Sequence, residues 1–150
     1  MDIESAVVVV DGREWQKDLP DLGDLEVLVA PWENPAFERG MQKAIRALPP
    51  ALRADGNIEP TAYAGVLGRV MAKTILFDWR NFKSGGAEKP FDAAYAQELL
   101  VNPRYKPFRD GVIAAAKRVQ QGVKAETEAV VGNSSSSSTG SANGDQTSSS

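Results

Sequence analysis

The first thirty residues alternate short apolar runs with turn signals, which is the pattern of a small antiparallel sheet. Residues 6–10 (AVVVV) form a β-branched run that ends at Asp11-Gly12, a dipeptide that favours a tight turn. Residues 14–17 predict a short return strand, and residues 25–30, where Val27 and Val29 alternate with other side chains, predict another. We therefore expect two or three strands that pack on helices, because so small a sheet is marginal by itself.

Beyond residue 30 the apolar positions recur at helical spacing. Asn34 can cap a helix that has Pro35 at its first position, and Pro49-Pro50 ends this helix. A second helix opens at Pro60, and its spacing of three and four residues predicts a core face. That face consists of Tyr63, Val66, Leu67, Val70, Met71 and Thr74. We expect the helix to run into residues 75–77 (ILF), the most apolar stretch of the chain.

Two further helices follow a turn at Gly85-Gly86. Asp92 caps a short helix, and Asn102-Pro103 ends it and begins the last one. In the last helix the apolar positions again alternate between spacings of three and four: Tyr105, Phe108, Val112, Ala115 and Val119. Such a narrow seam is typical of a helix that packs along one partner, either inside the same domain or on another molecule.

These elements predict an α+β fold that is mainly α. A small N-terminal antiparallel β-sheet or hairpin precedes four to five helices in a single domain over residues 1–131. Residues 132–150 are rich in serine and contain almost no apolar side chains. Nothing in this segment offsets the entropy cost of ordering a chain, so we expect a disordered tail.

The residue types exclude much of enzyme chemistry. The chain contains no histidine and no cysteine. Disulfides, thiolate sites, Ser-His-Asp catalysis and most zinc or transition-metal sites are therefore excluded, which leaves carboxylate, lysine or Mg²⁺ chemistry. Gly85-Gly86 lacks the spacing and the Lys-Ser/Thr of a phosphate-binding loop. We expect no catalytic residue, no cofactor and no metal, and hence no enzyme.

Charge is unevenly distributed along the chain, whose net charge is −3. The first thirty residues hold eight acids and two bases, and the remainder is mildly basic. The basic residues of the last helix lie around it rather than along the aromatic seam, so we expect no nucleic-acid partner. No apolar run approaches the roughly 18 residues needed to span a membrane, and we expect no secretory signal, because the first residues lack its positive start. We expect a soluble protein of the host cytoplasm.

Six aromatic residues are candidates for contact with a partner protein, because aromatic side chains are enriched at interaction hot spots. They are Phe77, Trp79, Phe82, Phe91, Tyr105 and Phe108. Trp79 has two readings: a ring that plugs the core, or an exposed anchor for a partner.

Several segments of the chain, in their order and spacing, resemble a family of small tailed-phage proteins. They are residues 75–82 (ILFDWRNF), a glycine-containing loop, 89–92 (KPFD), 98–100 (ELL), Asn102-Pro103, 105–109 (YKPFR) and Gly132-Asn133. The helix start at 34–37 (NPAF) after a β-rich segment also fits. Together they are similar to siphophage tail assembly chaperones, which are encoded beside the tape measure protein. Arg80 and Asn81 depart from the family, where an acidic or glycine residue is more usual.

The resemblance covers roughly residues 5–133 and implies a function in protein binding. It implies a chaperone that binds the tape measure protein and helps to recruit tail-tube subunits during long-tail morphogenesis, with self-association as a further expectation. The alternative is a minor structural tail or connector protein of the virion.

Overall fold

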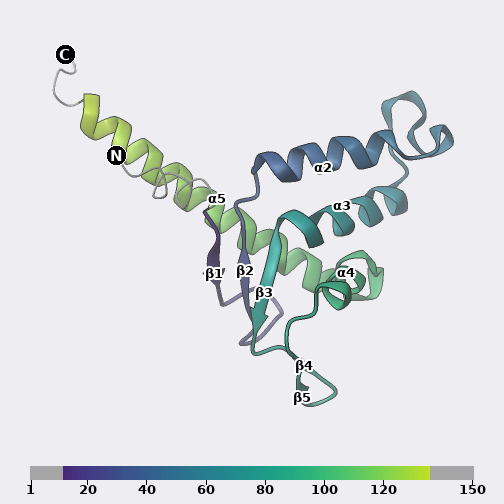
Figure 1. Ribbon diagram of the computed structural model, residues 1–150, viewed down its shortest axis with the longest axis horizontal. Coiled ribbons are helices and arrows are strands. Elements are labelled where there is room, and N and C mark those ends of the chain that lie inside the picture. The colour runs from purple at the N-terminus through teal and green to yellow at the C-terminus, as the bar shows by residue number, and fades with distance from the viewer. Residues whose placement is uncertain (1–11, 136–150) are drawn as a thin grey trace. The chain divides into compact units, whose positions relative to one another are not determined.

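The computed structural model describes residues 12–135, and for Asp55 and residues 125–135 it describes the backbone alone. The described residues up to Gln120 belong to one compact unit, and those from Gln121 onward belong to a second. The first unit contains the sheet, α2, α3, α4 and the first half of α5 (Figure 1). The strand expected at residues 6–10 lies outside the described residues.

An antiparallel sheet in the order β1-β2-β3 stands at the centre of the first unit. β1 (Glu14–Gln16) and β2 (Glu26–Val29) are strands that the sequence predicts. β3 (Leu76–Arg80) corrects a prediction, because residues 76 and 77 were expected to continue a helix. Short apolar runs do not distinguish strand from helix, and here pairing with β2 selects the strand.

The sheet buries one face. Val27, Val29 and Leu76 are fully buried, and Trp79, which lies opposite Val27, is 4% exposed. The register between β2 and β3 shifts beside Phe77, so that Val29 pairs with Leu76 while Leu28 pairs with Asp78. This bulge keeps Leu76 and Trp79 on the core face, whereas Phe77 lies off it.

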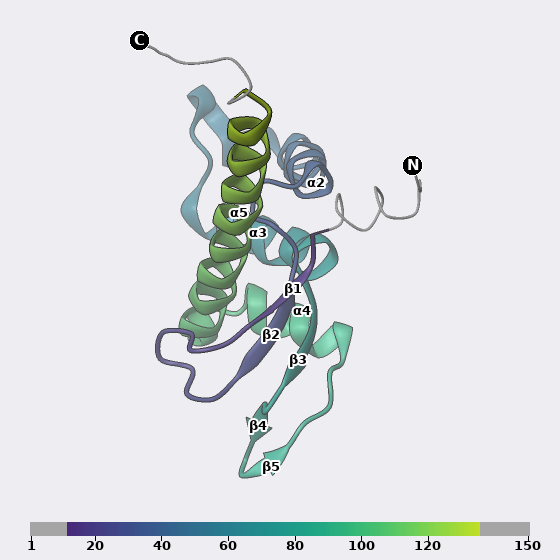
Figure 2. The same ribbon diagram turned by 90° about the vertical axis from the view of Figure 1, so that its left-hand side faces the viewer.

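Two capped helices follow β2 and precede β3. α2 (Pro35–Arg46) has Asn34 as its N-cap, whose side chain accepts a hydrogen bond from the Phe37 backbone N–H, as the sequence predicts. After a short 3₁₀ segment (Pro50–Gly56), α3 (Pro60–Thr74) begins with Glu59 as its cap. Figures 1 and 2 show α2 beside α3, and Val70 of α3 closely approaches Gly40 of α2.

The remaining elements follow β3. A hairpin, β4 (Lys83–Ser84) with β5 (Ala87–Glu88), turns at Gly85-Gly86, where both residues have positive φ. α4 (Ala93–Val101) is capped by Asp92, as expected. A 3₁₀ turn (Pro103–Tyr105) then leads into α5 (Lys106–Ser135).

α5 is longer than the sequence predicts. Residues 132–135, expected to begin a disordered tail, continue the helix. Extending an existing helix costs much less than nucleating one, so a helix can run a turn into a polar segment. The rest of the predicted tail, residues 136–150, lies outside the described residues.

The seam predicted on the last helix packs inside the first unit. Phe108, Val112, Ala115 and Val119 are buried, whereas Tyr105 lies in the preceding 3₁₀ turn and is 40% exposed. The backbone N–H of Trp32 donates to the Ala116 carbonyl at 3.1 Å, and the Arg118 guanidinium donates to backbone carbonyls of the loop after β1. These contacts hold the first half of α5 against the sheet and its loops, and the predicted fold class is confirmed.

Candidate functional site

Trp79 is the centre of an aromatic cluster in the core. Phe82 stacks on it with a centroid distance of 4.4 Å, and Phe91 meets it edge-on at 4.8 Å. Tyr95 and Phe108 each lie at 6.2 Å with nearly perpendicular rings. The indole Nε1–H of Trp79 donates to the Lys89 carbonyl at 2.9 Å. Of the two possibilities for Trp79, a core residue or an exposed anchor, the structure therefore shows the core residue. Its ring packs against its neighbours and is not exposed to a partner.

An open pocket of about 400 Å³ lies beside this cluster. Its walls come from the loop before β2, the segment after β3, α4, the 3₁₀ turn before α5 and the start of α5. The lining residues are Leu22, Asp24, Leu25, Asn81, Phe82, Lys83, Ser84, Tyr95, Leu99, Tyr105 and Phe108. We call this the aromatic pocket. Its lining combines apolar and aromatic side chains with the polar residues Asp24, Asn81, Lys83 and Ser84, and its volume is typical of a site that takes a bulky side chain or a small ligand.

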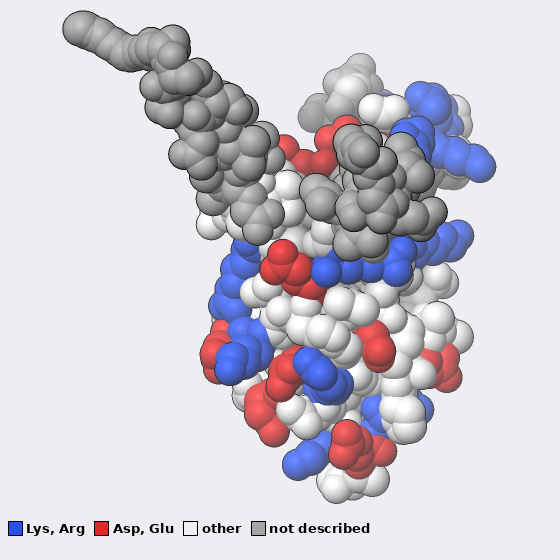
Figure 3. All heavy atoms as spheres, turned by 60° about the vertical axis from the view of Figure 1, so that its left-hand side comes forward, with Lys and Arg blue, Asp and Glu red and all other residues white. Residues whose placement is uncertain are grey.

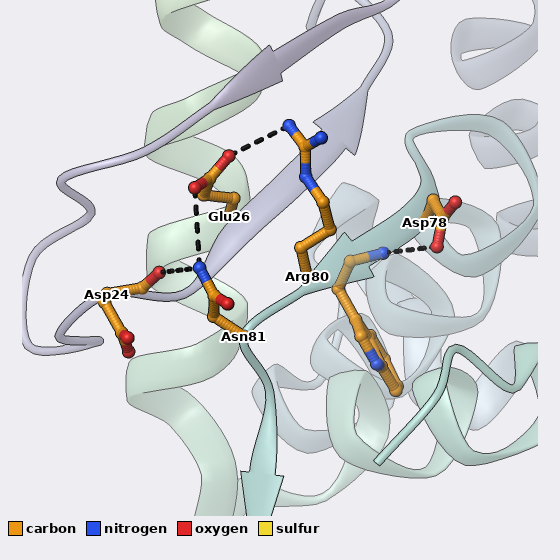
Figure 4. Close-up of polar contacts among 6 residues, drawn as sticks. Asp24, Glu26, Asp78, Arg80 and Asn81 are labelled. Carbon is orange, nitrogen blue, oxygen red and sulfur yellow. Dashed lines mark hydrogen bonds and ion pairs between the residues drawn. The ribbon is translucent and has the colours of Figure 1, made fainter. Parts of the chain in front are cut away.

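A polar network fixes the corner that carries Phe82 into this pocket. Arg80 forms an ion pair with Glu26 at 2.9 Å, and its guanidinium lies 3.7 Å from the centre of the Trp15 ring. The Asn81 amide donates to the Asp24 carbonyl at 3.2 Å and to a carboxylate oxygen of Glu26 at 3.5 Å (Figure 4). The chain turns here because Asn81 has a φ of 60°, a conformation that asparagine tolerates better than most residues.

This network accounts for the departure noted in the sequence. Glycine would be the usual residue at a left-handed position, and Asn81 adopts that conformation while its amide tethers the corner to the start of β2. Arg80, the other unusual residue, anchors the same corner through Glu26.

The six predicted aromatic residues are not all brought together at one surface. Phe82, Tyr105 and Phe108 line the aromatic pocket, and Trp79 and Phe91 pack behind it. Phe77 lies elsewhere, because the bulge in β3 places it under the Arg13 guanidinium, 3.6 Å from its ring centre. The structure thus divides the set into pocket walls, supporting rings and one separate ring.

Sequence reasoning missed several walls of the pocket. Tyr95 and Leu99 are four residues apart on α4, a spacing that places both on one helix face, and this pattern could have identified them. Leu22 and Leu25 sit in the loop that enters β2 and reach the pocket through contacts with distant parts of the chain, so no local pattern marks them.

One face of the described surface carries charges of both signs. Basic and acidic side chains are interleaved on the face that Figure 3 shows. Among the described residues no three carboxylates gather where they could hold a metal ion, and no helix is long and apolar enough to cross a membrane. The geometry that stands out is the aromatic pocket.

Comparison with known proteins identifies the class of this chain. A family described as YdaY prophage protein matches residues 32–133, about two thirds of the chain. This is a prophage protein, and it belongs to the YdaY prophage protein family. The match begins after β2 and extends into α5. No curated protein and no solved structure matches the chain. The expected phage origin is confirmed, and the specific role in tail assembly stays a prediction.

Proposed function

We propose that this prophage protein is a tail assembly chaperone that binds the tape measure protein and helps to recruit tail-tube subunits during long-tail morphogenesis. It acts by binding alone and catalyses no reaction. The observation that carries the proposal is the aromatic pocket, in which three of the predicted partner-binding residues, Phe82, Tyr105 and Phe108, converge on one opening. The resemblance to tail assembly chaperones and the membership in a prophage family support the same conclusion.

The physical argument is one of complementarity between apolar surfaces. A tape measure protein of the kind the resemblance implies is a long helix with apolar stripes, which needs cover before the tail tube encloses it. An amphipathic helix binds by inserting apolar side chains into a groove or pocket. The aromatic pocket can accept one such side chain, and its aromatic walls are held by the cluster around Trp79.

Preorganisation favours this pocket as an anchor. Phe82 is stacked on Trp79, and Phe108 is buried, so little side-chain freedom remains to be lost when a partner binds. Tyr105 is the exposed member of the set, at the mouth of the pocket. Asp24 and Lys83 at the edge supply one charge of each sign for orientation of the partner.

Two tyrosines of nearly equal exposure provide a matched test. Tyr105 is 40% exposed and lines the pocket, whereas Tyr63, on α3, is 41% exposed and does not. The chain would be co-expressed with the tape measure protein encoded by the same prophage, and the soluble tape measure protein that co-purifies would be measured. We expect Tyr105→Ala to reduce the recovered partner strongly and Tyr63→Ala to leave it unchanged. Equal recovery with both variants would remove the pocket from the proposal.

The role in assembly has its own test. The resemblance to tail assembly chaperones implies that this protein is absent from the finished virion, so mass spectrometry of purified particles should find the tape measure protein without this chain. Finding the chain at a fixed ratio in finished particles would contradict a chaperone and support a minor structural tail or connector protein.

A further inference from the structure

A second pocket, of about 360 Å³, lies where α2 begins and α3 ends. It is lined by Arg13, Ala30, Asn34, Pro35, Ala36, Arg39, Lys73, Thr74 and Phe77. We call it the basic pocket, and it shares no lining residue with the aromatic pocket.

The basic pocket has charge of one sign. Within the described part of the chain, the ionisable residues of its lining are all basic: Arg13, Arg39 and Lys73. The Arg13 guanidinium lies over the Phe77 ring, which holds one of these charges at the pocket wall. Arg39 and Lys73 are exposed, and neither forms an ion pair with another residue in the described part of the chain.

The framework around these cations is fixed and includes apolar atoms. The Asn34 amide donates to the Pro31 carbonyl at 2.8 Å and to the Thr74 carbonyl at 3.3 Å, which ties the start of α2 to the end of α3. Besides the cations and the polar residues Asn34 and Thr74, the lining is apolar, with Ala30, Pro35, Ala36 and Phe77. A bare anion would satisfy the charges but would leave this apolar wall uncovered, so the complementary ligand carries both carboxylates and an apolar group.

We propose that the basic pocket docks an acidic peptide segment of a protein partner, with an apolar side chain against Phe77 and carboxylates facing Arg39 and Lys73. Charge complementarity selects this occupant, because none of the described residues that line the pocket is acidic. The basic pocket is separate from the aromatic pocket, so an experiment can refute this proposal without refuting the proposed function, and the reverse.

The test uses the full chain and a fluorescein-labelled synthetic peptide in which aspartates and glutamates alternate with leucines. Binding would be followed by fluorescence anisotropy at low and high salt. Reversing both charges in the double variant Arg39→Glu, Lys73→Glu should weaken binding by at least about tenfold, since two attractions become repulsions. Arg46→Glu, in the last turn of the same helix and outside the pocket, is the matched control and should change it less than about twofold.

Further measurements distinguish the acidic peptide from other possible ligands of the basic pocket. A peptide with lysines in place of the acids should bind the double variant and not the wild type. Circular dichroism would confirm that every variant is folded. The proposal is overturned if the acidic peptide does not bind, or if a peptide with asparagine and glutamine in place of its acids binds equally well. It is also overturned if Arg46→Glu weakens binding of the acidic peptide as much as the double variant does. It is also overturned if inorganic phosphate binds as tightly as the peptide, because the apolar wall would then contribute nothing.

Discussion

Replacing Gly68 by alanine probes the contact between α3 and α4, which supports the aromatic pocket from behind. A Cβ atom added at Gly68 would lie 2.5 Å from the Leu100 carbonyl oxygen and 2.9 Å from Cγ1 of Val101. The oxygen belongs to the backbone of α4 and cannot rotate away as a side chain can, so the two helices must separate. Gly65, three residues earlier on α3, offers a matched control, because a Cβ there would meet only the flexible end of Arg69 at 3.3 Å.

The two substitutions share one energy term and differ in another. Alanine stabilises a helix interior relative to glycine by about 1 kcal/mol, which applies to both variants. Overpacking of a tight contact costs about 1–3 kcal/mol, which applies to Gly68→Ala alone. We therefore expect Gly65→Ala to be as stable as the wild type or more stable by up to about 1 kcal/mol. Gly68→Ala should be less stable than Gly65→Ala by roughly 1–3 kcal/mol.

Urea denaturation measures this difference, with tryptophan fluorescence and far-UV circular dichroism as two independent signals. Trp79, one of the three tryptophans that contribute to the fluorescence, is buried beside α4, so the signal includes a reporter of this contact. Coincident transitions from both signals would justify a two-state free energy of unfolding. If Gly68→Ala proved as stable as Gly65→Ala, the close approach of α3 to the α4 backbone would be refuted.

Three further predictions concern single polar groups. Asn34→Ala should lower the free energy of unfolding by about 1–2 kcal/mol, while Asn34→Ser keeps a cap and should lose less; equal losses would contradict the capping role. Two backbone N–H groups in the first turn of α3 donate to Glu59 and lower the pKa of its carboxyl. Its contribution to stability is therefore complete above the ordinary glutamate pKa and is lost as the pH falls through the lowered value. The stability gap between wild type and Glu59→Gln should close in acid, and a gap that is independent of pH would refute this. Trp79→Phe removes the donor to the Lys89 carbonyl and should cost about 1–3 kcal/mol in urea denaturation; a variant as stable as the wild type would show that this hydrogen bond is dispensable.

The parts of the fold that could be predicted are those set by neighbouring residues. Asn34, Asp92 and Asn102 were expected at helix boundaries, and each side chain accepts hydrogen bonds from backbone N–H groups just after it. Such caps act over three residues, so the local sequence contains the whole signal. The turn at Gly85-Gly86 is local in the same sense.

The parts that could not be predicted depend on contacts between distant segments. β3 is a strand because β2, far away in the sequence, pairs with it, and the bulge at Phe77 follows from that pairing. The same bulge separates Phe77 from the aromatic residues of the pocket. Leu22 and Leu25 reach the pocket from the other end of the sequence, across the packing of the β1–β2 loop on α5. A list of aromatic residues could therefore include Phe82, Tyr105 and Phe108 without showing that these three share one opening.

The most direct measurement of the central claim is the affinity of the purified full chain for soluble fragments of the tape measure protein, determined by isothermal titration calorimetry. The account predicts that one fragment binds the wild type and Tyr63→Ala equally, and that Tyr105→Ala weakens this binding by at least about tenfold, as expected for an anchor at the mouth of the aromatic pocket. If no fragment bound, or if both tyrosine variants bound as tightly as the wild type, binding of the tape measure protein through this pocket would be contradicted.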